Sequence, residues 1–276
     1  MDKETVQKIK EKALLIRKDL IRITTLAGSG HPGGSLSAAD IFATLYFHVL
    51  KHDPKNPNWE QRDRFILSAG HICPGLYGTM AHAGYFPLKE LDTLRKYPSR
   101  LQGHPSRVSL PGIETSTGSL GQGISVAVGM ALGFKLDKKK NKVFCLMGDG
   151  EQNEGEVWEA AQSASHYKLD NIIAIVDWND VQQDGKNSDT MNIEPLEKKY
   201  EAFGWHTIVV DGNNVEELLN AFDEAKKIKG KPSIILAKTI MGKNVSFMEG
   251  KYEYHGKTLK AEEAQKAYEE LEKNAL

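Results

Sequence analysis

The segment MGDGEQNEGEVWEA, residues 147–160, contains five acidic residues and directly follows the short apolar run VFCL. They are Asp149, Glu151, Glu154, Glu156 and Glu159. Three interpretations are open: a phosphate-binding loop, a metal site, or a turn that begins a helix with an acidic, solvated face. Glycines such as those around Asp149 let the backbone approach a ligand closely, and the start of the following helix favours an anion.

A carboxylate beside a phosphate would be repelled unless a cation lay between them, so the Gly148–Gly150 turn favours a shared divalent metal. Asn179 follows the next apolar run of the chain. If the two runs are neighbouring parallel strands, Asn179 reaches the same place as Asp149. With the backbone carbonyl of Val181, these groups would form an oxygen site for Mg²⁺ or Ca²⁺. A turn with a helix N-cap remains the alternative for Asp149, and a plain loop position for Asn179.

Alternating apolar runs and helical patterns must position these groups. Strands are predicted at 64–68, 142–147, 171–177, 206–211 and 233–239, and helices at 4–27, 37–50, 124–134, 154–167, 193–203, 214–229 and 260–273. Loops or turns are predicted at 28–35, 69–78, 110–123 and 241–258. The pattern predicts an α/β fold, a mainly parallel sheet with helices on both faces. Ligands bind such sheets at the carboxyl ends of strands, which is where Asp149 and Asn179 lie.

The composition excludes several classes of protein. The chain has 276 residues and a net charge of −1, with no electrostatic preference for nucleic acid or an anionic membrane. Its two cysteines, Cys73 and Cys145, lie in apolar surroundings, which favours a reducing cytoplasm over a disulfide framework. The charged N-terminus lacks the apolar core of a signal peptide or membrane span.

Five segments, in order from about residue 20 to residue 258, resemble the transketolase family. GDGEQNEGEVWEAAQSASHYKLDNIIAIVDWND is similar to the thiamine diphosphate-binding motif, which opens with Gly-Asp-Gly and closes with Asn after the next strand. The segments that resemble the family's histidine-bearing stretches are GSGHPGGSLSAADI, LSAGHICPGLYG, LQGHPSRVSLPGIETSTGSLGQGISVAVGMAL and EYHGKTL. The resemblance implies the diphosphate-binding domain of a thiamine diphosphate enzyme, taken as a single domain over residues 1–276.

The resemblance also implies roles for the matched residues. The histidines implied at the sugar, the diphosphate and the reacting carbons are His31, His71, His104 and His255. The implied cofactor contacts are His71, Gly118, Leu120, Gly148, Asp149, Gly150, Glu154, Asn179 and His255. The implied metal ligands are Asp149, Asn179 and Val181. Histidines suit proton transfer because their usual pKa lies near neutrality, although hydrogen-bonded loop positions remain the simpler interpretation of each one alone.

The acidic residues of the motif are expected to differ in role. In the family, the glutamate that matches Glu154 joins a buried carboxylate network across a subunit interface, so the resemblance implies this role here. A favourable first-turn carboxylate is the alternative. Glu151, Glu156 and Glu159 are expected on a solvated helix face. Two residues depart from the family pattern: Trp178, where the family has a small polar residue, and Tyr254, which precedes His255.

The function implied by the resemblance is ketol transfer, the movement of a two-carbon unit from a ketose or its phosphate to an aldose or its phosphate. In the family, the glutamate that activates the cofactor comes from a pyrimidine-binding domain, which is followed by a C-terminal domain; no such segments follow the diphosphate module here. We therefore expect a split enzyme with natural termini. This chain would be its N-terminal subunit, and its partner in an α2β2 assembly would be a C-terminal subunit.

Other functions stay open at this point. One is the diphosphate-binding subunit of another thiamine diphosphate enzyme, such as a 2-oxo acid dehydrogenase α-subunit or a deoxyxylulose phosphate synthase relative. Another is an inactive cofactor-binding remnant. A Rossmann nucleotide-binding protein is disfavoured, because no Gly-x-Gly-x-x-Gly follows the first predicted strand.

Overall fold

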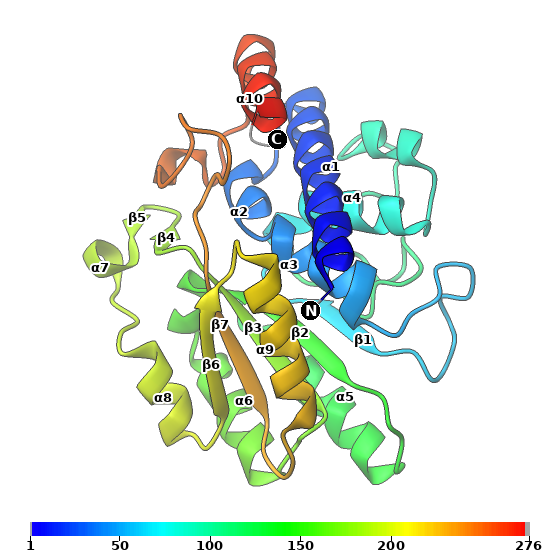
Figure 1. Ribbon diagram of the computed structural model, residues 1–276, viewed down its shortest axis with the longest axis vertical. Coiled ribbons are helices and arrows are strands. Elements are labelled where there is room, and N and C mark those ends of the chain that lie inside the picture. The colour runs from blue at the N-terminus through cyan, green and yellow to red at the C-terminus, as the bar shows by residue number, and fades with distance from the viewer. Residues whose placement is uncertain (1, 274–276) are drawn as a thin grey trace.

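The structure is a computed structural model that describes residues 2–273 (Figure 1). Its centre is a five-stranded parallel sheet in the order β1-β2-β3-β7-β6. The strands are β1 (Arg64–Leu67), β2 (Val143–Gly148), β3 (Ile172–Trp178), β6 (His206–Asp211) and β7 (Ser233–Lys238). A separate antiparallel hairpin follows β3 and consists of β4 (Val181–Gln182) and β5 (Gly185–Lys186). All five predicted strands are present, and the predicted parallel α/β sheet is confirmed.

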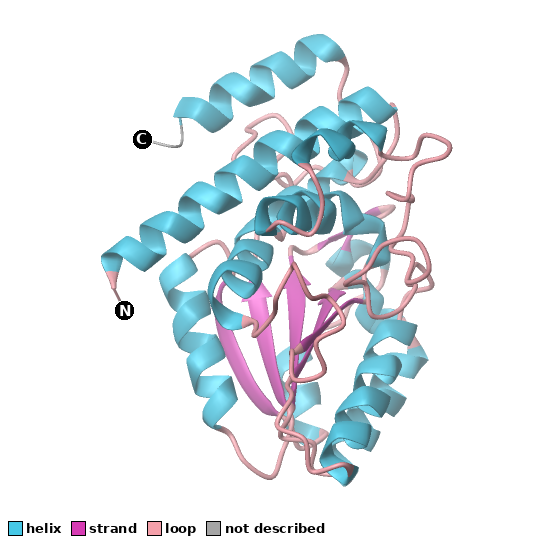
Figure 2. Ribbon diagram, turned by 90° about the vertical axis from the view of Figure 1, so that its right-hand side faces the viewer, coloured by secondary structure: helices cyan, strands magenta, loops and turns pink. Residues whose placement is uncertain are grey.

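Helices cover both faces of the sheet (Figure 2). They are α1 (Lys3–Ala27), α2 (Pro32–Ser37), α3 (Ala39–Thr44), α4 (Cys73–Ala83), α5 (Gln122–Leu136), α6 (Gly155–His166), α7 (Asn187–Thr190), α8 (Leu196–Ala202), α9 (Val215–Lys227) and α10 (Ala261–Lys273). Short 3-10 turns lie at Gly70–Ile72, Leu88–Thr93, Gly150–Asn153 and Tyr252–Tyr254. Among residues 2–273, no helix is long and apolar enough to cross a membrane.

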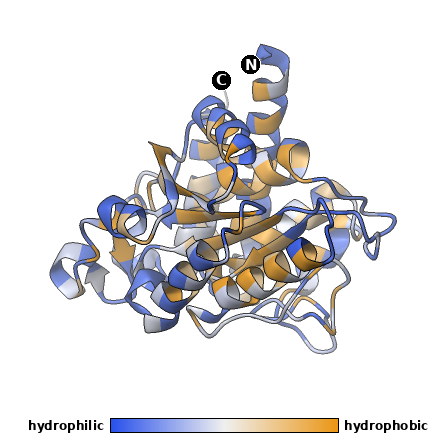
Figure 3. Cartoon of the chain, turned by 90° about the horizontal axis from the view of Figure 1, so that it is seen from below, coloured by the Kyte–Doolittle hydropathy of each residue, from blue (hydrophilic) through white to orange (hydrophobic). Residues whose placement is uncertain are grey.

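The apolar strands are buried because each face of the sheet packs on helices. Alternate strand residues point to opposite faces. Phe144 and Leu146 of β2 therefore belong to a core that includes α3, α4 and α9, whereas Cys145 and Met147 belong to a core that includes α5, α6 and α8. Figure 3 shows the apolar strands in the interior of the molecule. This two-sided burial is the reason that the strands read as continuous apolar runs.

The glycine-rich segment 28–35 behaves differently from the prediction. Helix α1 does end at Ala27, where Gly28 takes the left-handed conformation, with φ 64°. A new helix, α2, then begins at Pro32, inside the segment that was expected to be a loop. Proline is well tolerated in the first helical turn, because the N–H that it lacks would have no partner there.

Another prediction was wrong for a related reason. The segment 69–78, expected to be a turn, forms a 3-10 turn at Gly70–Ile72 and then enters α4. Pro74 lies in the first turn of α4, so it does not break the helix. The helix predicted at 37–50 is largely confirmed, because α3 continues directly into a π-helical turn at Leu45–Val49. Residues of α2 and of the 3-10 turn at Gly70–Ile72 lie at the carboxyl end of the sheet, where the predicted site residues gather.

Candidate active site

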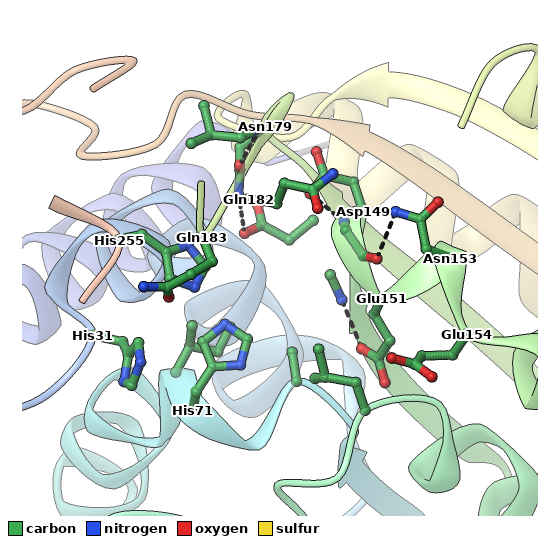
Figure 4. A pocket seen from close by; sticks show the side chains of 18 of the residues that line it. His31, His71, Asp149, Glu151, Asn153, Glu154, Asn179, Gln182, Gln183 and His255 are labelled. Carbon is green, nitrogen blue, oxygen red and sulfur yellow. Dashed lines mark hydrogen bonds between the residues drawn. The ribbon is translucent and has the colours of Figure 1, made fainter. Parts of the chain in front are cut away.

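A cavity of about 510 Å³ lies at the carboxyl ends of β2 and β3 (Figure 4). It is lined by every residue that the sequence implied: His31, His71, His104, Gly118, Leu120, Gly148, Asp149, Gly150, Glu154, Asn179, Val181 and His255. The register pairs Gly148 with Asp177, so the loops after β2 and β3 leave the sheet side by side. The fold thus brings distant segments of the chain to one place, while the individual roles of their residues stay predictions.

Asp149 is a buried carboxylate, with a side chain that is only 2% exposed. Its Oδ1 accepts from the Gly150 N–H over 2.8 Å, and its Oδ2 accepts from the Asp180 N–H over 2.6 Å and from Asn187 Nδ2 over 2.9 Å. No basic side chain pairs with it in the described part of the chain. Burial, together with the nearby charge of Asp177, raises the pKa of Asp149 to about 7. A carboxylate in this position is suited to a cation as its partner.

The amide of Asn179 is held in one orientation. Its Nδ2 donates to Asp177 Oδ2 over 3.0 Å, and its Oδ1 accepts from the Val181 N–H over 3.1 Å. Asp177 also accepts from Ser37 Oγ and Thr239 Oγ1, each over 2.5 Å. Because an ionised carboxylate only accepts, the amide nitrogen must face Asp177 and the amide oxygen must face away from it.

These groups fit a hard divalent cation. One carboxylate, one amide oxygen and a backbone carbonyl are the donor types that Mg²⁺ and Ca²⁺ take in proteins. Within residues 2–273 there is no cluster of three or more His, Cys, Asp or Glu side chains suited to a metal. The ion would therefore depend on the mixed oxygen set of Asp149, Asn179 and Val181, with ligand phosphates completing its coordination.

Three histidines from distant segments face one another across the cavity. The ring centroids of His31 and His71 are 5.1 Å apart, those of His71 and His255 5.1 Å, and those of His31 and His255 5.6 Å. Nδ1 of His31 and Nδ1 of His255 are buried without a hydrogen-bond partner among the described residues. Such nitrogens are available to a bound ligand.

The histidines were expected to titrate near neutral pH, but burial changes their pKa values. Burial lowers the pKa of His31 to about 4 and that of His71 to about 3. Burial also lowers the pKa of His255 and of the more exposed His104. The imidazoles are therefore neutral at pH 7 in the free chain instead of titrating near it. A neutral imidazole offers one donor and one acceptor, which suits hydroxyl and carbonyl oxygens.

Gly118 has a steric reason to be glycine. Its φ is +150°, and an added Cβ would lie 3.0 Å from Cδ2 of His104. A side chain at this position would displace the histidine ring from the wall of the cavity. The loop can therefore approach both His104 and a ligand only because no side chain intervenes.

The prediction for Glu151 was wrong. This residue was expected on a solvated helix face, but its side chain is 2% exposed. A 3-10 turn at Gly150–Asn153 precedes α6, so the helical periodicity does not extend back to Glu151. Glu154, in contrast, is exposed on this chain, and Glu159 lies on the exposed face of α6 as expected.

Sequence reasoning also missed two polar side chains that support Asp149 and Asn179. Asp177 is the penultimate residue of β3, and its position near a strand terminus was the signal that could have identified it. Asn187 is buried and links Asp149 to the hairpin, since its Oδ1 accepts from Gln182 Nε2 over 2.8 Å. No local pattern marks Asn187, because it acts across the β4–β5 hairpin.

The two departures from the family pattern lie away from the cavity. Trp178 packs against the core on the α5 and α6 side, and Lys238 Nζ lies 5.0 Å from its ring centroid. Tyr254 packs against Phe247, with ring centroids 6.0 Å apart. Neither side chain lines the cavity, so neither replaces a predicted ligand group.

Comparisons with known proteins agree with this geometry. Residues 10–275 match the family model for the transketolase thiamine diphosphate binding domain. The chain is 46% identical to the 6-deoxy-6-sulfo-D-fructose transketolase subunit SqwG of Clostridium sp. (strain MSTE9), over 96% of either protein. It is 39% identical to one of the subunits of the apulose-4-phosphate transketolase of Phocaeicola vulgatus, over 98% of this chain and 95% of that one.

A solved transketolase has the same fold. The enzyme from Campylobacter jejuni superposes with a TM-score of 0.89 at 36% identity, over 99% of this chain and 43% of that one. The chain thus spans less than half the length of that transketolase, but nearly the whole length of the two subunits named above. Since the family model also covers nearly all of the chain, the chain belongs to the transketolase family, in which it corresponds to the thiamine diphosphate-binding domain.

Proposed function

We propose that this chain is the N-terminal subunit of a two-chain transketolase, which transfers a two-carbon ketol unit from a ketose to an aldose. The observation that carries the proposal is the single cavity that unites Asp149, Asn179 and the four histidines. Two relatives that the chain covers almost completely are each named as transketolase subunits, which supports a two-chain enzyme.

Thiamine diphosphate would occupy the cavity with Mg²⁺ or Ca²⁺ held by Asp149, Asn179 and the Val181 carbonyl. Gly150 and His255 would contact the diphosphate, and Gly118 and Leu120 would contact the cofactor through their backbone. When bound, the cofactor supplies the nucleophilic carbon and stabilises the carbanion that ketol transfer requires.

The histidines would act on the sugar. In the proposed site, His31 and His104 contact sugar hydroxyls, and His71 and His255 lie near the diphosphate and the reacting carbons. Neutral imidazoles can orient hydroxyl and carbonyl oxygens, and accept or return a proton at a free ring nitrogen. Nδ1 of His31 and Nδ1 of His255 have no hydrogen-bond partner among the described residues, which leaves both imidazoles with unused polar capacity.

The partner would be a C-terminal subunit that supplies the pyrimidine-binding domain and the activating glutamate, in an α2β2 assembly. This chain would then form a single diphosphate-binding domain, since two of its apolar clusters share the five strands and a third packs α1 and α10 against α3 and α9. Glu154 is exposed and lines the cavity, a position from which it can join a carboxylate network with the partner. The free, buried cysteines Cys73 and Cys145 support a cytoplasmic location.

The substrates would be sugars with an anionic end. A second cavity, of about 460 Å³, is lined by Ser29, Arg95 and Gly103, among others, and Gly103 directly precedes His104 of the first cavity. Arg95 donates to the Gly103 carbonyl over 3.2 Å and has no carboxylate at ion-pair distance among residues 2–273. A guanidinium without an acidic partner is suited to a sugar phosphate or sulfonate.

We expect Arg95→Ala to raise KM for a phosphorylated ketose about tenfold, the effect of losing one charged hydrogen bond, with kcat little changed. KM for an unphosphorylated ketose should stay the same. Steady-state kinetics of the assembled enzyme with both donors would check this, and Lys89→Ala provides an exposed-cation control. Equal changes for both donors would show that Arg95 does not bind the anionic end.

The proposed function is tested by combining the two chains. We expect transfer from xylulose 5-phosphate to ribose 5-phosphate, with thiamine diphosphate and Mg²⁺, only when the C-terminal subunit is present together with this chain. Activity of this chain alone would contradict the two-chain proposal. Release of CO₂ from a 2-oxo acid by the pair, without ketol transfer, would instead identify a dehydrogenase-type thiamine enzyme.

A further inference from the structure

Glu151 connects three segments that form one wall of the cavity. Its Oε1 accepts from the Gly121 N–H over 2.8 Å and from Ser68 Oγ through a short hydrogen bond, and its Oε2 accepts from the Gly148 N–H over 3.0 Å. Ser68 follows β1, Gly121 ends the loop that contains Gly118, and Gly148 ends β2. In Figure 4 the side chain lies beside Glu154, below Asp149.

Two glycines, Gly121 and Gly123, allow the backbone to pack closely around the carboxylate of Glu151. Gly121 has φ +83°, and a Cβ added there would lie 2.8 Å from Cβ of Glu154. A Cβ added to Gly123 would lie 2.5 Å from Ser68 Oγ and 2.7 Å from its Cα. Only glycines allow this loop to come so close to the ends of β1 and β2. The close approach delivers the Gly121 N–H to Glu151.

The hydrogen bonds of Glu151 fix the backbone next to the proposed cofactor contacts. Gly148 directly precedes Asp149, and Gly121 directly follows Leu120. A shift of either peptide would move a metal ligand or a backbone contact. Glu151 borders the cavity, but three protein donors use most of the acceptor capacity of its two oxygens, and two of these donors are backbone N–H groups. A pre-organised site binds more tightly, since no ordering free energy is spent on binding.

We infer that Glu151 is a positioning residue that locks the 118–121 loop to the Gly-Asp-Gly turn, so that thiamine diphosphate and its metal meet a preformed cradle. The inference rests on the proposed function, because it assigns the purpose of the lock to that cofactor. It concerns a residue to which the proposed function gives no contact with the sugar or the metal. Its effect should therefore appear in cofactor affinity and loop stability before it appears in turnover.

The test is Glu151→Gln, which keeps the size of the side chain but replaces one oxygen with a donor. Each oxygen of Glu151 accepts from a backbone N–H, Oε1 from Gly121 and Oε2 from Gly148, so in either orientation the new amide nitrogen faces one of these donors and leaves it unsatisfied. We expect the Kd for thiamine diphosphate in the assembled enzyme to rise about tenfold at fixed Mg²⁺. We expect kcat at saturating cofactor to stay within about twofold of the wild type.

A second readout does not depend on the cofactor. Hydrogen exchange of the cofactor-free full chain should accelerate about tenfold at the amides of residues 118–123 and 147–151, and stay unchanged in β7. Glu159→Gln, which removes an exposed carboxylate from α6, is the charge-matched control. Ser68→Ala removes one of the three donors and should act in the same direction, which keeps the test valid if Glu151→Gln does not fold.

The outcomes separate this inference from the proposed function. If the wild-type enzyme does not bind thiamine diphosphate, the proposed function fails. If the wild type binds and Glu151→Gln matches it in both affinity and local exchange, the positioning role is overturned. Faster exchange at the two segments with weaker cofactor binding and preserved kcat would establish it.

Discussion

Asp149→Ala is expected to abolish metal-dependent binding of thiamine diphosphate while leaving the fold intact. Asp149 is the single carboxylate in the proposed oxygen set, and it is buried without a basic partner among the described residues. Its removal takes away the negative charge that would bridge the protein to a metal-bound diphosphate. We expect the affinity to fall at least about 100-fold, which corresponds to roughly 3 kcal/mol.

Calorimetric titration of thiamine diphosphate in the presence of Mg²⁺ would measure this loss, and circular dichroism would monitor the fold. Asp189→Ala is a suitable control, since Asp189 is an exposed acid on α7 a few residues from the same hairpin. An unchanged affinity in Asp149→Ala would falsify the metal assignment. In that case Asp149 would act only as the hydrogen-bonded centre of the loop, a role shown by its bonds to Gly150, Asp180 and Asn187.

The second large effect is expected in the pH dependence of metal and cofactor binding. In the metal-free chain, burial raises the pKa of Asp149 to about 7, from an ordinary value of 3.8. Only the ionised carboxylate binds a metal, so the affinity is full above pH 7 and is lost as the pH falls through 7. Below that pH we expect about a tenfold loss per unit, or roughly 100-fold at pH 5.

Two of the cavity histidines, His31 and His71, do not obscure this window. Because the pKa of His31 is about 4 and that of His71 is about 3, both stay neutral from pH 8 down to pH 5. Mg²⁺ titrations at constant thiamine diphosphate would give the profile, with protein-free titrations to correct for protonation of the diphosphate. Calorimetry in two buffers of different ionisation enthalpy should also detect proton release on binding at pH 6. A flat profile without proton release would contradict the assigned pKa shift.

Much of the fold follows from local patterns in the sequence. The strands β2, β3 and β7 are apolar on both faces, and the helices between them have clear periodicity. Such patterns arise from the residues of one segment, so they can be read without knowing the rest of the chain. The helices α2 and α4 were missed because proline and glycine usually interrupt helices, and only the chain position of Pro32 and Pro74 within the first turn reverses that rule.

In the candidate site, too, some residues could be assigned from local sequence patterns and others could not. Asp149 and Asn179 could be assigned to one site because neighbouring parallel strands carry them, and the register of β2 with β3 confirms that they are neighbours. Glu151 could not be distinguished from Glu159, since both are acidic residues beside the same helix. Its burial depends on Ser68 and Gly121, which lie in segments 83 and 30 residues away along the chain.

The sequence by itself determined the family, the parallel sheet and many of the residues that line the cavity, because these are recorded in motifs and in the periodicity of single segments. Only the tertiary structure decided the state of those residues. It made the histidines neutral, raised the pKa of Asp149 and turned Glu151 inward. The physical reason is that desolvation and hydrogen bonding depend on chain segments that meet only after folding, whereas residue type and spacing do not.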